Sequence, residues 1–349
     1  MTINTTASTA QNAGSSTPPT GRPIAIWLLI MCGLVAAMVI VGGATRLTDS
    51  GLSITEWRPV TGAIPPLNEE QWLEEFEKYK TIPEYEQVNY GMSLAEFKTI
   101  YWWEWGHRLL GRVIGAAFFF PMVFFIATGR ARGRLALKLI GLFVLGGLQG
   151  ALGWWMVTSG LADRIDVSQY RLAAHLSLAV ILFGLMFWLA LDLWPSKKVE
   201  TSRGLRLGAL LLAGGVFGQM LLGAFVAGLR AGRTFNTWPL MNGKFFPDGY
   251  FEGAPGLNDL FETIAAVQFN HRIGAYLLAL GAAWFFFSAR KTALKSRARL
   301  VLAAIGLQIV LGIWTILAAT PISLGLLHQA GALGVFAAAL YAAHNIEAS

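Results

Sequence analysis

Histidine is the residue type whose number and spacing most clearly point to chemistry in this chain. Four of the five histidines lie inside long apolar segments, two in each half of the sequence: His107, His175, His271 and His328. Each lies roughly 6–10 residues from the start of a segment long enough to cross a membrane. Ionisable side chains inside a bilayer are costly and mark functional sites, and imidazole is a usual ligand of haem iron. The simplest interpretation is a helical membrane protein with two bis-histidine haem sites.

The composition indicates an integral membrane protein. Of the 349 residues, 55% are hydrophobic and only 13% are charged, whereas a soluble domain carries about 25% charged residues. The net charge of +7 is explained by basic loops that set the topology, so no nucleic-acid partner is expected. The single cysteine, Cys32, lies in the first apolar segment. It excludes an intrachain disulfide and any CxxC motif, so a bound haem would be non-covalent.

Eight segments are apolar and near or above the ~20 residues that a helix needs to cross a bilayer. Residues 1–22 precede them, are rich in Ser, Thr, Ala and Asn, and are predicted to be a disordered tail. The tail has no arginine before Arg22, which disfavours a mitochondrial presequence and favours the inner membrane of a bacterium. The predicted spans are residues 24–44, 99–126, 135–157, 168–193, 206–228, 262–288, 300–319 and 322–344.

Charged residues orient these spans. Short basic loops follow the second, fourth and sixth spans, at residues 130–134, 197–206 and 290–299, and such loops face the cytoplasm. Both termini are then cytoplasmic, and the long loop of residues 45–98 lies outside, where its stretch Glu69–Lys80 is expected to form a solvated helix over the outer face. The even-numbered spans all run inwards, which places the four imidazoles at one depth, roughly 9–14 Å below the outer edge.

The sequence contains an internal repeat. The tripeptide Gly-Leu-Gln, followed by Leu-Gly and Trp, occurs at residues 147–155 and again at 306–314, and the dipeptide His-Arg occurs in both spans two and six. Parallel repeats of this kind place one site in each half. The fold predicted is therefore an all-α integral membrane protein of eight transmembrane helices, arranged as two pseudo-symmetric four-helix bundles at residues 23–195 and 196–349.

Arginines accompany the histidines. Haem propionates need cationic partners, and the arginine fork matches a carboxylate bidentately, although arginines near a membrane surface also snorkel towards the interface. For the histidines themselves, the alternative is a set of interhelical hydrogen bonds. Zinc is disfavoured because no carboxylate or thiolate completes a tetrahedral set in the second half. The candidate propionate partners are Arg108, Arg112, Arg171 and Arg272.

The two halves differ beside the histidines. Glu104 precedes His107 by three residues, which puts both on one face of a helix, whereas the matching residue in the second half is Gln268. A carboxylate beside one site and an amide beside the other predict unequal roles, with proton-coupled chemistry in the first half and haem binding alone in the second. The alternative is a structural glutamate that is bonded to a loop.

Several longer motifs lie in and beside the spans. They are residues 42–53 with Glu56, Trp57 and Pro59, then Glu104-Trp105-Gly106-His107-Arg108, Thr237-Trp238-Pro239-Leu240-Met241, Phe269-Asn270-His271-Arg272 and Leu327-His328-Gln329. Together they resemble the motifs of the haem A synthases, and the resemblance covers about residues 23–345. The chain resembles the form found in proteobacteria and mitochondria, because the external-loop cysteine pairs of the other bacterial form are absent.

The resemblance implies a function for each histidine pair. His271 and His328 would hold a resident haem B, and His107 and His175 would hold the substrate, haem O. The C8 methyl group of haem O would be oxidised to a formyl group by successive hydroxylations, giving haem A for cytochrome oxidase. Glu104 would accept or relay a proton, or stabilise positive charge at the methyl carbon. Haem O synthase and oxidase assembly factors are the partners implied, and a homo-oligomer is left open.

Two other functions would use the same histidines. A di-haem b-type electron-transfer cytochrome would bind two haems and leave them chemically unchanged. A transporter built from repeats would use the histidines as proton relays. A Soret absorption band separates haem proteins from a transporter, and analysis of the haem product separates a synthase from an electron carrier.

Overall fold

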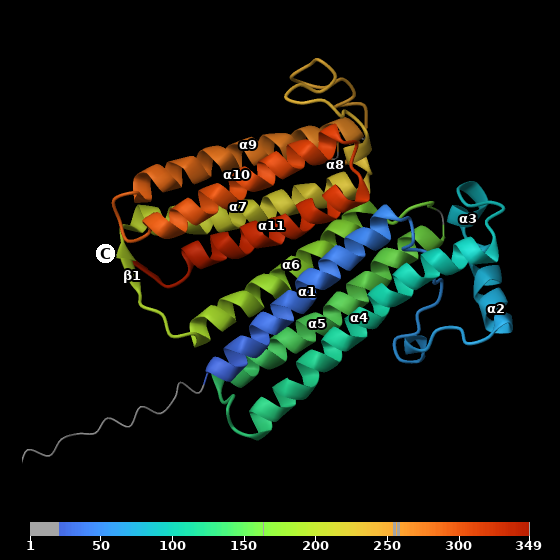
Figure 1. Cartoon of the computed structure of the whole chain (residues 1–349), viewed down its shortest axis with the longest axis horizontal. Coiled ribbons are helices and arrows are strands. Elements are labelled where there is room, and N and C mark those ends of the chain that lie inside the picture. The colour runs from blue at the N-terminus through green and yellow to red at the C-terminus, as the bar shows by residue number, and fades with distance from the viewer. Residues whose placement is uncertain (1–20, 163, 254–255, 257–258, 349) are drawn as a thin grey trace, which may run out of the picture.

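A computed structural model describes residues 21–162, 164–253, 256 and 259–348, so the predicted tail at residues 1–22 lies almost wholly outside the described part. Within those residues, eight helices are long and apolar enough to cross a membrane (Figure 1). They confirm the prediction of an all-α membrane protein. The eight are α1 (Arg22–Leu47), α4 (Leu94–Ala127), α5 (Arg134–Leu161), α6 (Gln169–Leu193), α7 (Arg203–Gly228), α9 (Ile264–Ala289), α10 (Lys295–Leu317) and α11 (Ile322–Ala343).

The remaining elements are short and lie at the ends of the long helices. Sequence periodicity alone predicts only one of them, the helix at residues 69–80. They are η1 (Thr61–Ala63), α2 (Glu69–Tyr79), α3 (Pro83–Gln87), β1 (Val199–Thr201), η2 (Ala231–Arg233), α8 (Asp259–Glu262) and β2 (Ile346–Ala348).

Helix α4 begins at Leu94, earlier than the predicted start at residue 99. Its N-terminus is a capping box, in which the Glu96 backbone N–H donates to the Ser93 hydroxyl at 3.3 Å and the Ser93 backbone N–H donates to the Glu96 carboxylate at 2.8 Å. These bonds satisfy N–H groups that have no partner inside the helix. The helix can therefore start outside the apolar segment and reach the external loop.

The long helices form two rings of four. In the first half α1 and α5 each pack on both α4 and α6, and in the second half α7 and α10 each pack on both α9 and α11. The halves meet through α6–α7, α1–α11 and α6–α11. Helix α1 takes the place of α7 in its ring, and α6 takes the place of α11. The α6–α7 contact therefore matches the α11–α1 contact, as expected for two halves related by a pseudo-twofold axis.

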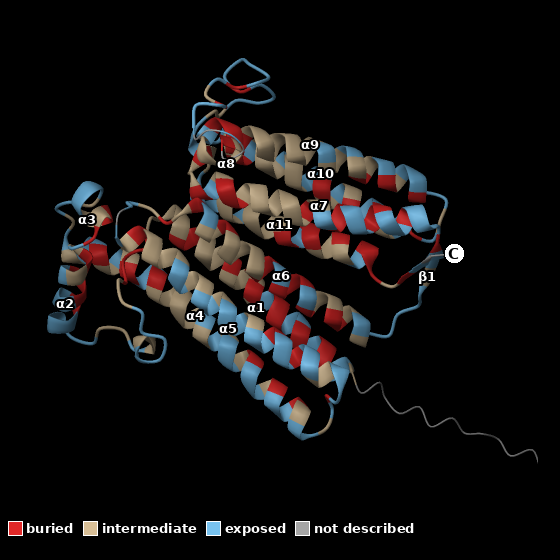
Figure 2. Ribbon diagram, turned by 180° about the vertical axis from the view of Figure 1, so that it is seen from behind, coloured by how far each residue is buried: buried red, intermediate tan, exposed pale blue. Residues whose placement is uncertain are grey.

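Burial follows this arrangement. The helices α1, α6 and α7 have the largest shares of buried positions, while the peripheral helices expose large apolar side chains (Figure 2). Phe120, Leu137, Leu277 and Leu307 are examples of such exposed residues. In a soluble protein they would form an aggregating surface, but lipid tails solvate them as well as a protein core does. The peripheral faces are therefore lipid-facing surfaces.

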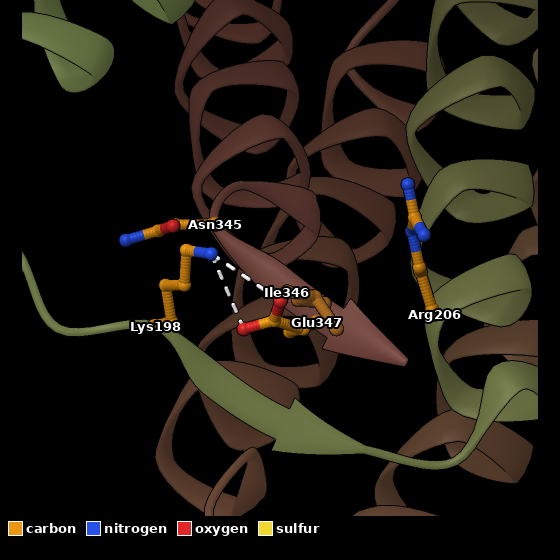
Figure 3. Close-up of a pocket in the computed structure, with 5 residues that line it drawn as sticks. All are labelled: Lys198, Arg206, Asn345, Ile346 and Glu347. Atoms are coloured by element: carbon orange, nitrogen blue, oxygen red, sulfur yellow. Dashed lines mark hydrogen bonds and ion pairs between the residues drawn. The ribbon is translucent and has the colours of Figure 1, made fainter. Parts of the chain in front are cut away.

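The two short strands join the halves at one end of the molecule. They pair in parallel, with Val199 opposite Ile346, so the segment between the bundles is tied to the C-terminus. Lys198 and Glu347 form an ion pair of 3.3 Å beside them (Figure 3). The start of α1 lies at this same end of the molecule (Figure 1), as expected if both termini lie on one side of the membrane.

A folded cap covers the opposite end of the first bundle. Trp72, Phe76 and Tyr79 on one face of α2 are buried with Phe97 and Tyr101 of α4, and the rings of Phe76 and Phe97 stack with centroids 4.9 Å apart. The glutamates of α2 lie mainly on its other face. The predicted surface helix is thus present. Its aromatic residues hold it on α4, a contact that the acidic character of the sequence does not suggest.

Glu84 of α3 is a buried carboxyl inside the cap, with 4% of its surface exposed. The Tyr79 hydroxyl donates to its Oε2 at 3.2 Å, and the Asn89 amide donates to the Tyr79 oxygen at 2.7 Å. Burial raises the pKa of Glu84 to about 8, and the carboxylates of Asp166 and Asp49 act in the same direction. Neutral Glu84 therefore fits this position better than its anion.

The raised pKa of Glu84 predicts a cap that loosens as pH rises towards 8. Because the folded-state pKa lies above the usual value of 4.5, the contribution of Glu84 to stability is complete below about 4.5 and is lost progressively as pH rises through about 8. Protection from hydrogen exchange at residues 69–90, corrected for the intrinsic pH dependence of exchange, should fall over this range. Glu84→Gln, which is neutral at every pH, should remove that dependence, whereas Glu86→Gln, an exposed position on the same helix, should leave it. Equal pH slopes in all three proteins would contradict the prediction.

Candidate functional site

The four predicted histidines occupy matching places in the two bundles. His107 lies on α4 and His175 on α6, and His271 and His328 lie on α9 and α11. In each bundle these two helices are diagonally opposed across the ring of contacts described above. The repeat seen in the sequence therefore becomes a repeat in space, with one histidine pair in each half.

The second pair has the spacing that one iron atom needs. The ring centroids of His271 and His328 are 6.3 Å apart, with the ring planes at 73°. Two imidazoles on one metal place their ring centres about 6 Å apart, since each metal–nitrogen bond is about 2 Å and the ring centre lies about 1 Å further. Among the described residues, no three His, Cys, Asp or Glu side chains gather into a metal site. The donor set fits two axial ligands of a haem rather than a tetrahedral zinc.

Every imidazole lies against a glycine on a neighbouring helix. A Cβ built on Gly42 of α1 would lie 3.1 Å from Nε2 of His107. The other three glycines meet the Cε1 atoms of their histidines, with distances of 2.9 Å at Gly153, 3.3 Å at Gly223 and 2.8 Å at Gly312. Any larger residue would push the ring away. The sequence-based prediction does not include these glycines as site residues, although the repeat itself contains Gly153 and Gly312.

Three of the histidines also contact a glutamine one helical turn before that glycine. The Nε2 atoms of Gln149, Gln219 and Gln308 each lie 3.1 Å from Nδ1 of the histidine, which is His175, His271 and His328 in turn. Each amide also donates to the backbone carbonyl of the same histidine, at 2.7–3.0 Å. The matching position beside His107 is Met38, whose methyl group lies near Gly111 of α4. These contacts also were not predicted from the sequence.

Glu104 is a buried carboxylate, with 2% of its surface exposed, one turn from His107. Its Oε2 accepts hydrogen bonds from the Ser53 hydroxyl and the Ile54 backbone N–H, both at 2.7 Å. Its Oε1 accepts from Arg108 at 2.6 Å and 3.1 Å. Four donated hydrogen bonds thus reach the two carboxylate oxygens. These contacts match the alternative named above, in which Glu104 is a structural residue bonded to a loop. They also hold its carboxylate in place beside His107.

Gln268 holds a loop at the corresponding place in the second half, but it does so by donating hydrogen bonds to backbone carbonyls. Its Nε2 donates to the carbonyls of Ala231 and Thr234, at 2.9 Å and 2.8 Å, and its Oε1 accepts from Arg272 at 3.3 Å. A carboxylate receives N–H and O–H donors, whereas an amide can also offer N–H groups to carbonyls. Both side chains therefore hold an external loop onto a histidine-bearing helix, and only the first adds a charge.

The four predicted arginines all lie on histidine-bearing helices, at the end of each bundle that is opposite the β1–β2 pair, and all donate to backbone carbonyls. Arg108 bonds the carbonyls of Ile54 and Glu56, and Arg112 bonds those of Arg58 and Pro59. In the same way, Arg272 bonds Phe235 and Thr237, while Arg171 bonds Trp155. The Nη1 atom of Arg112 is buried without a hydrogen-bond partner. That orphaned donor is free to meet an anionic group.

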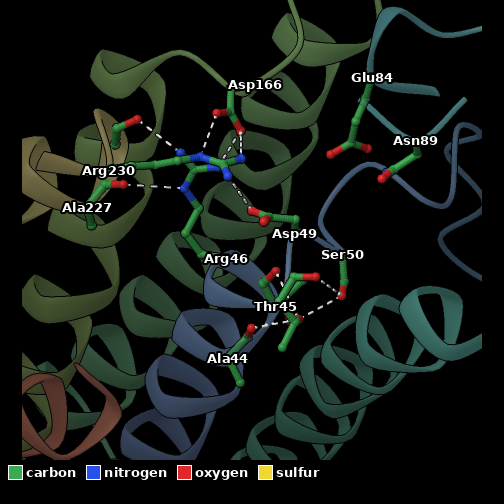
Figure 4. Close-up of polar contacts among 12 residues, drawn as sticks. Ala44, Thr45, Arg46, Asp49, Ser50, Glu84, Asn89, Asp166, Ala227 and Arg230 are labelled. Carbon is green, nitrogen blue, oxygen red and sulfur yellow. Dashed lines mark hydrogen bonds and ion pairs between the residues drawn. The ribbon is translucent and has the colours of Figure 1, made fainter. Parts of the chain in front are cut away.

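A charge network joins the two halves at this same end (Figure 4). Asp166, from the loop between α5 and α6, forms ion pairs with Arg46 of α1 and with Arg230, which lies beyond α7. Arg230 also pairs with Asp49 at 2.8 Å. Partial burial opposes ionisation of Asp166, but the hydrogen bonds from the two arginines outweigh it and hold its pKa below the usual value. These residues lie far apart in the sequence, and none was predicted.

The fifth histidine, His344, lies outside both pairs. It follows the C-terminus of α11 and is buried, with its Nε2 2.9 Å from the Asp192 carboxylate and its ring edge-on to Trp188. It is therefore a hydrogen-bonded structural histidine. Because it is buried but has no place in either pair, it is a matched control for substitutions at the other four.

Comparison with known proteins agrees with the resemblance seen in the sequence. A haem A synthase of Parvibaculum lavamentivorans is 55% identical over 335 residues, covering 96% of this chain and 97% of the relative. Haem A synthases of Caulobacter vibrioides and Nitrosospira multiformis are 53% and 51% identical and cover 91% and 93% of this chain, and 94% of each relative. The COX15-CtaA family model, described as cytochrome oxidase assembly protein, matches residues 25–340. The chain therefore belongs to the COX15-CtaA family of cytochrome oxidase assembly proteins.

Proposed function

We propose that this chain is a haem A synthase that oxidises the C8 methyl group of haem O to a formyl group by successive hydroxylations. The observation that carries the proposal is the 6.3 Å spacing of the His271 and His328 rings, in a chain 55% identical to a haem A synthase over nearly its whole length. The chain works in the inner membrane of a bacterium with both termini in the cytoplasm. Haem O synthase supplies the substrate, and oxidase assembly factors receive the product.

The two histidine pairs have unequal roles in this proposal. His271 and His328 hold a resident haem B, and His107 and His175 hold haem O. A bound haem B would supply one-electron transfer, tuned by its two axial imidazoles and its burial. The uncharged Gln268 beside the second pair and the charged Glu104 beside the first support this division.

Glu104 stabilises positive charge that develops at the methyl carbon of haem O. Its carboxylate is fixed by Ser53, Ile54 and Arg108, so it costs no reorganisation during the reaction. Because its oxygens are already occupied by donors, this electrostatic role fits the geometry better than repeated proton uptake. The glutamate then serves both as an anchor for the loop and as a fixed charge.

The arginines bind the haem propionates at the external end of each bundle. An arginine has five N–H donors, and those of Arg108, Arg112, Arg171 and Arg272 are only partly used by backbone carbonyls. The orphaned Nη1 of Arg112 is the strongest support, because a buried unsatisfied donor is costly unless a ligand meets it. The same side chains would then hold both the loop and the edge of the macrocycle.

Substitution of single histidines should separate the two pairs. His271→Ala and His328→Ala should lose most of the haem B that co-purifies with the protein, because one imidazole cannot replace two axial ligands. His107→Ala and His175→Ala should keep that haem B and fail to convert haem O. Extracted haems are identified by chromatography after co-expression with a haem O source, with His344→Ala as the control. If both histidine pairs of the protein held haem B and the supplied haem O were not converted, the result would instead favour a di-haem electron carrier.

Glu104→Gln should lower haem A production by about 100-fold or more, since it removes a pre-organised charge while keeping the size of the side chain. The haem B content and the amount of folded protein should stay close to wild type. Ser53→Ala is the matched control: it removes one bond to the carboxylate but leaves the charge, so most activity should remain. Wild-type haem A output from Glu104→Gln would refute the electrostatic role, and equal losses in both variants would mean that loop anchoring alone matters.

A further inference from the structure

A loop of the first half folds back along the histidine-bearing helix α4. The carbonyls of Arg58 and Pro59 accept hydrogen bonds from Arg112 of α4, both at 2.8 Å, and η1 packs on the same helix. A Cβ built on Gly62 of η1 would lie 2.8 Å from Nη2 of Arg112. The loop thus leaves the cap and returns along the side of α4 (Figure 1). Residues 57–67 are called the first tip.

The second half contains a matching loop beside α9. The Trp238 indole N–H donates to the Tyr276 hydroxyl of α9 at 3.1 Å. Tyr276 is the counterpart of Arg112 in the repeat, because each follows the histidine of its helix by five positions. Residues 237–246 are called the second tip. The two tips are therefore held at corresponding places on the two histidine-bearing helices.

Both tips are held deep along these helices. At 1.5 Å per residue, Arg112 is about 22 Å from the end of α4 at Ala127, and Tyr276 is about 20 Å from the end of α9 at Ala289. A basic loop follows each of these helix ends and marks one edge of the hydrocarbon core. Helical side chains lean towards the N-terminus, so the tip atoms that they contact lie about one turn, roughly 5 Å, further along. Because the core is about 30 Å thick, both tips reach its opposite edge or lie just inside it.

Tryptophans mark that edge independently. Trp154 of α5 is about 30 Å from the start of its helix at Arg134. Trp314 of α10 is about 28 Å from the start of its helix at Lys295. Both are exposed, and exposed tryptophan is enriched where a membrane meets water. The ring of Trp57 lies beside that of Trp154, with centroids 6.1 Å apart, so the first tip begins at this belt.

The tips expose large apolar side chains at this level. Those of the first tip are Val60, Ile64 and Leu67, which are 80%, 67% and 75% exposed. Those of the second tip are Trp238, Leu240, Phe245 and Phe246. Each tip has a single charged residue, and each of these has an opposite charge beside it: Arg58 pairs with Glu56, and Lys244 pairs with Asp248. The cost of placing either tip against lipid is therefore small.

The surface next to both tips is the one that faces lipid. Val113 follows Arg112 on α4, and Leu277 follows Tyr276 on α9, and both are exposed apolar residues. The tips are thus continuous with the lipid-facing surfaces of the peripheral helices. In water their side chains would form apolar patches of the kind that aggregates, whereas a segment with apolar side chains is stable at the boundary between headgroups and acyl chains.

We propose that both tips insert into the leaflet at the end of the molecule that carries the cap, and that lipid is the partner of their exposed apolar side chains. The inference goes beyond the proposed function and does not depend on the chemistry of the histidines. The loops held by Arg112 and Tyr276 are then part of the wall that each bundle presents to lipid, rather than lids that face only water.

The first test measures the depth of each tip in a bilayer. Ile64→Cys and Phe245→Cys, each with Cys32→Ala, are labelled with an environment-sensitive dye in the full-length protein in phosphatidylcholine nanodiscs. A lipid that carries a nitroxide near its headgroup should quench most of the emission, and aqueous iodide should quench little of it. Tyr90→Cys in the cap and Glu252→Cys near the start of α9 are exposed controls, and they should show the reverse.

The second test examines what holds the first tip in the bilayer. The dye is placed on Val60→Cys, and Ile64→Asp and Leu67→Asp are introduced together. Charged side chains are costly inside a membrane, so lipid quenching should be lost and iodide quenching gained. Ile64→Met with Leu67→Met, the matched control, keeps the side chains apolar and should leave both kinds of quenching as they are without these substitutions.

The outcomes decide between lipid and the other possible surroundings of the tips. Quenching of both tips by iodide, and not by the lipid nitroxide, would overturn their insertion. Shielding from both quenchers would overturn lipid as the partner, and a difference between nanodiscs that hold one copy and two copies would identify a second copy of the chain in its place. Unchanged quenching of the Val60→Cys label by the paired aspartates would show that the apolar side chains are not the anchor and would overturn that part of the proposal.

Discussion

The contact between each imidazole and a glycine of the neighbouring helix sets the geometry of the whole protein. Apolar side chains gain nothing by leaving lipid for another helix, so helices in a bilayer associate through close packing and interhelical hydrogen bonds. Here Gly42, Gly153, Gly223 and Gly312 let neighbouring helices approach the four histidines closely. The residues that permit the helices to approach and the residues that would hold iron are therefore parts of one interface. A larger residue at any of these glycines would disturb both the bundle and the site.

The Glu104 and Gln268 anchors show how one structural arrangement can be built with two different polarities. Glu104 and Gln268 both tie a loop to a histidine-bearing helix, and both contact an arginine one turn later. The loops present N–H and O–H donors to the carboxylate but carbonyl acceptors to the amide. The two halves thus keep the same architecture while only one of them places a fixed negative charge beside its histidine. The proposed division between a reactive site and a binding site rests on this difference of polarity at one anchor.

Polar contacts also join the two bundles at both ends of the molecule. The ion pairs of Asp166 with Arg46 and Arg230 connect α1, the loop before α6 and the segment after α7, and the paired strands β1 and β2 connect the halves at the other end. Charges with several partners in a partly buried position are stabilised jointly, whereas an isolated exposed pair contributes little. Between these two ends the halves touch through α6, α7, α1 and α11.

Much of this protein could be predicted from its sequence, because the bilayer imposes a simple rule on composition and length. The eight spans, the four histidines and the repeat that relates His107 to His271 all follow from hydropathy and spacing. The predicted start of α4 was wrong by five residues, since a capping box rather than apolarity determines where that helix begins. The glycines and glutamines behind the histidines, the polarity of the Glu104 and Gln268 anchors, and the partners of Asp166 were decided only by the tertiary structure. Helices that are apolar on all sides carry no stripe to show how each is rotated about its own axis, and that rotation determines which side chains meet.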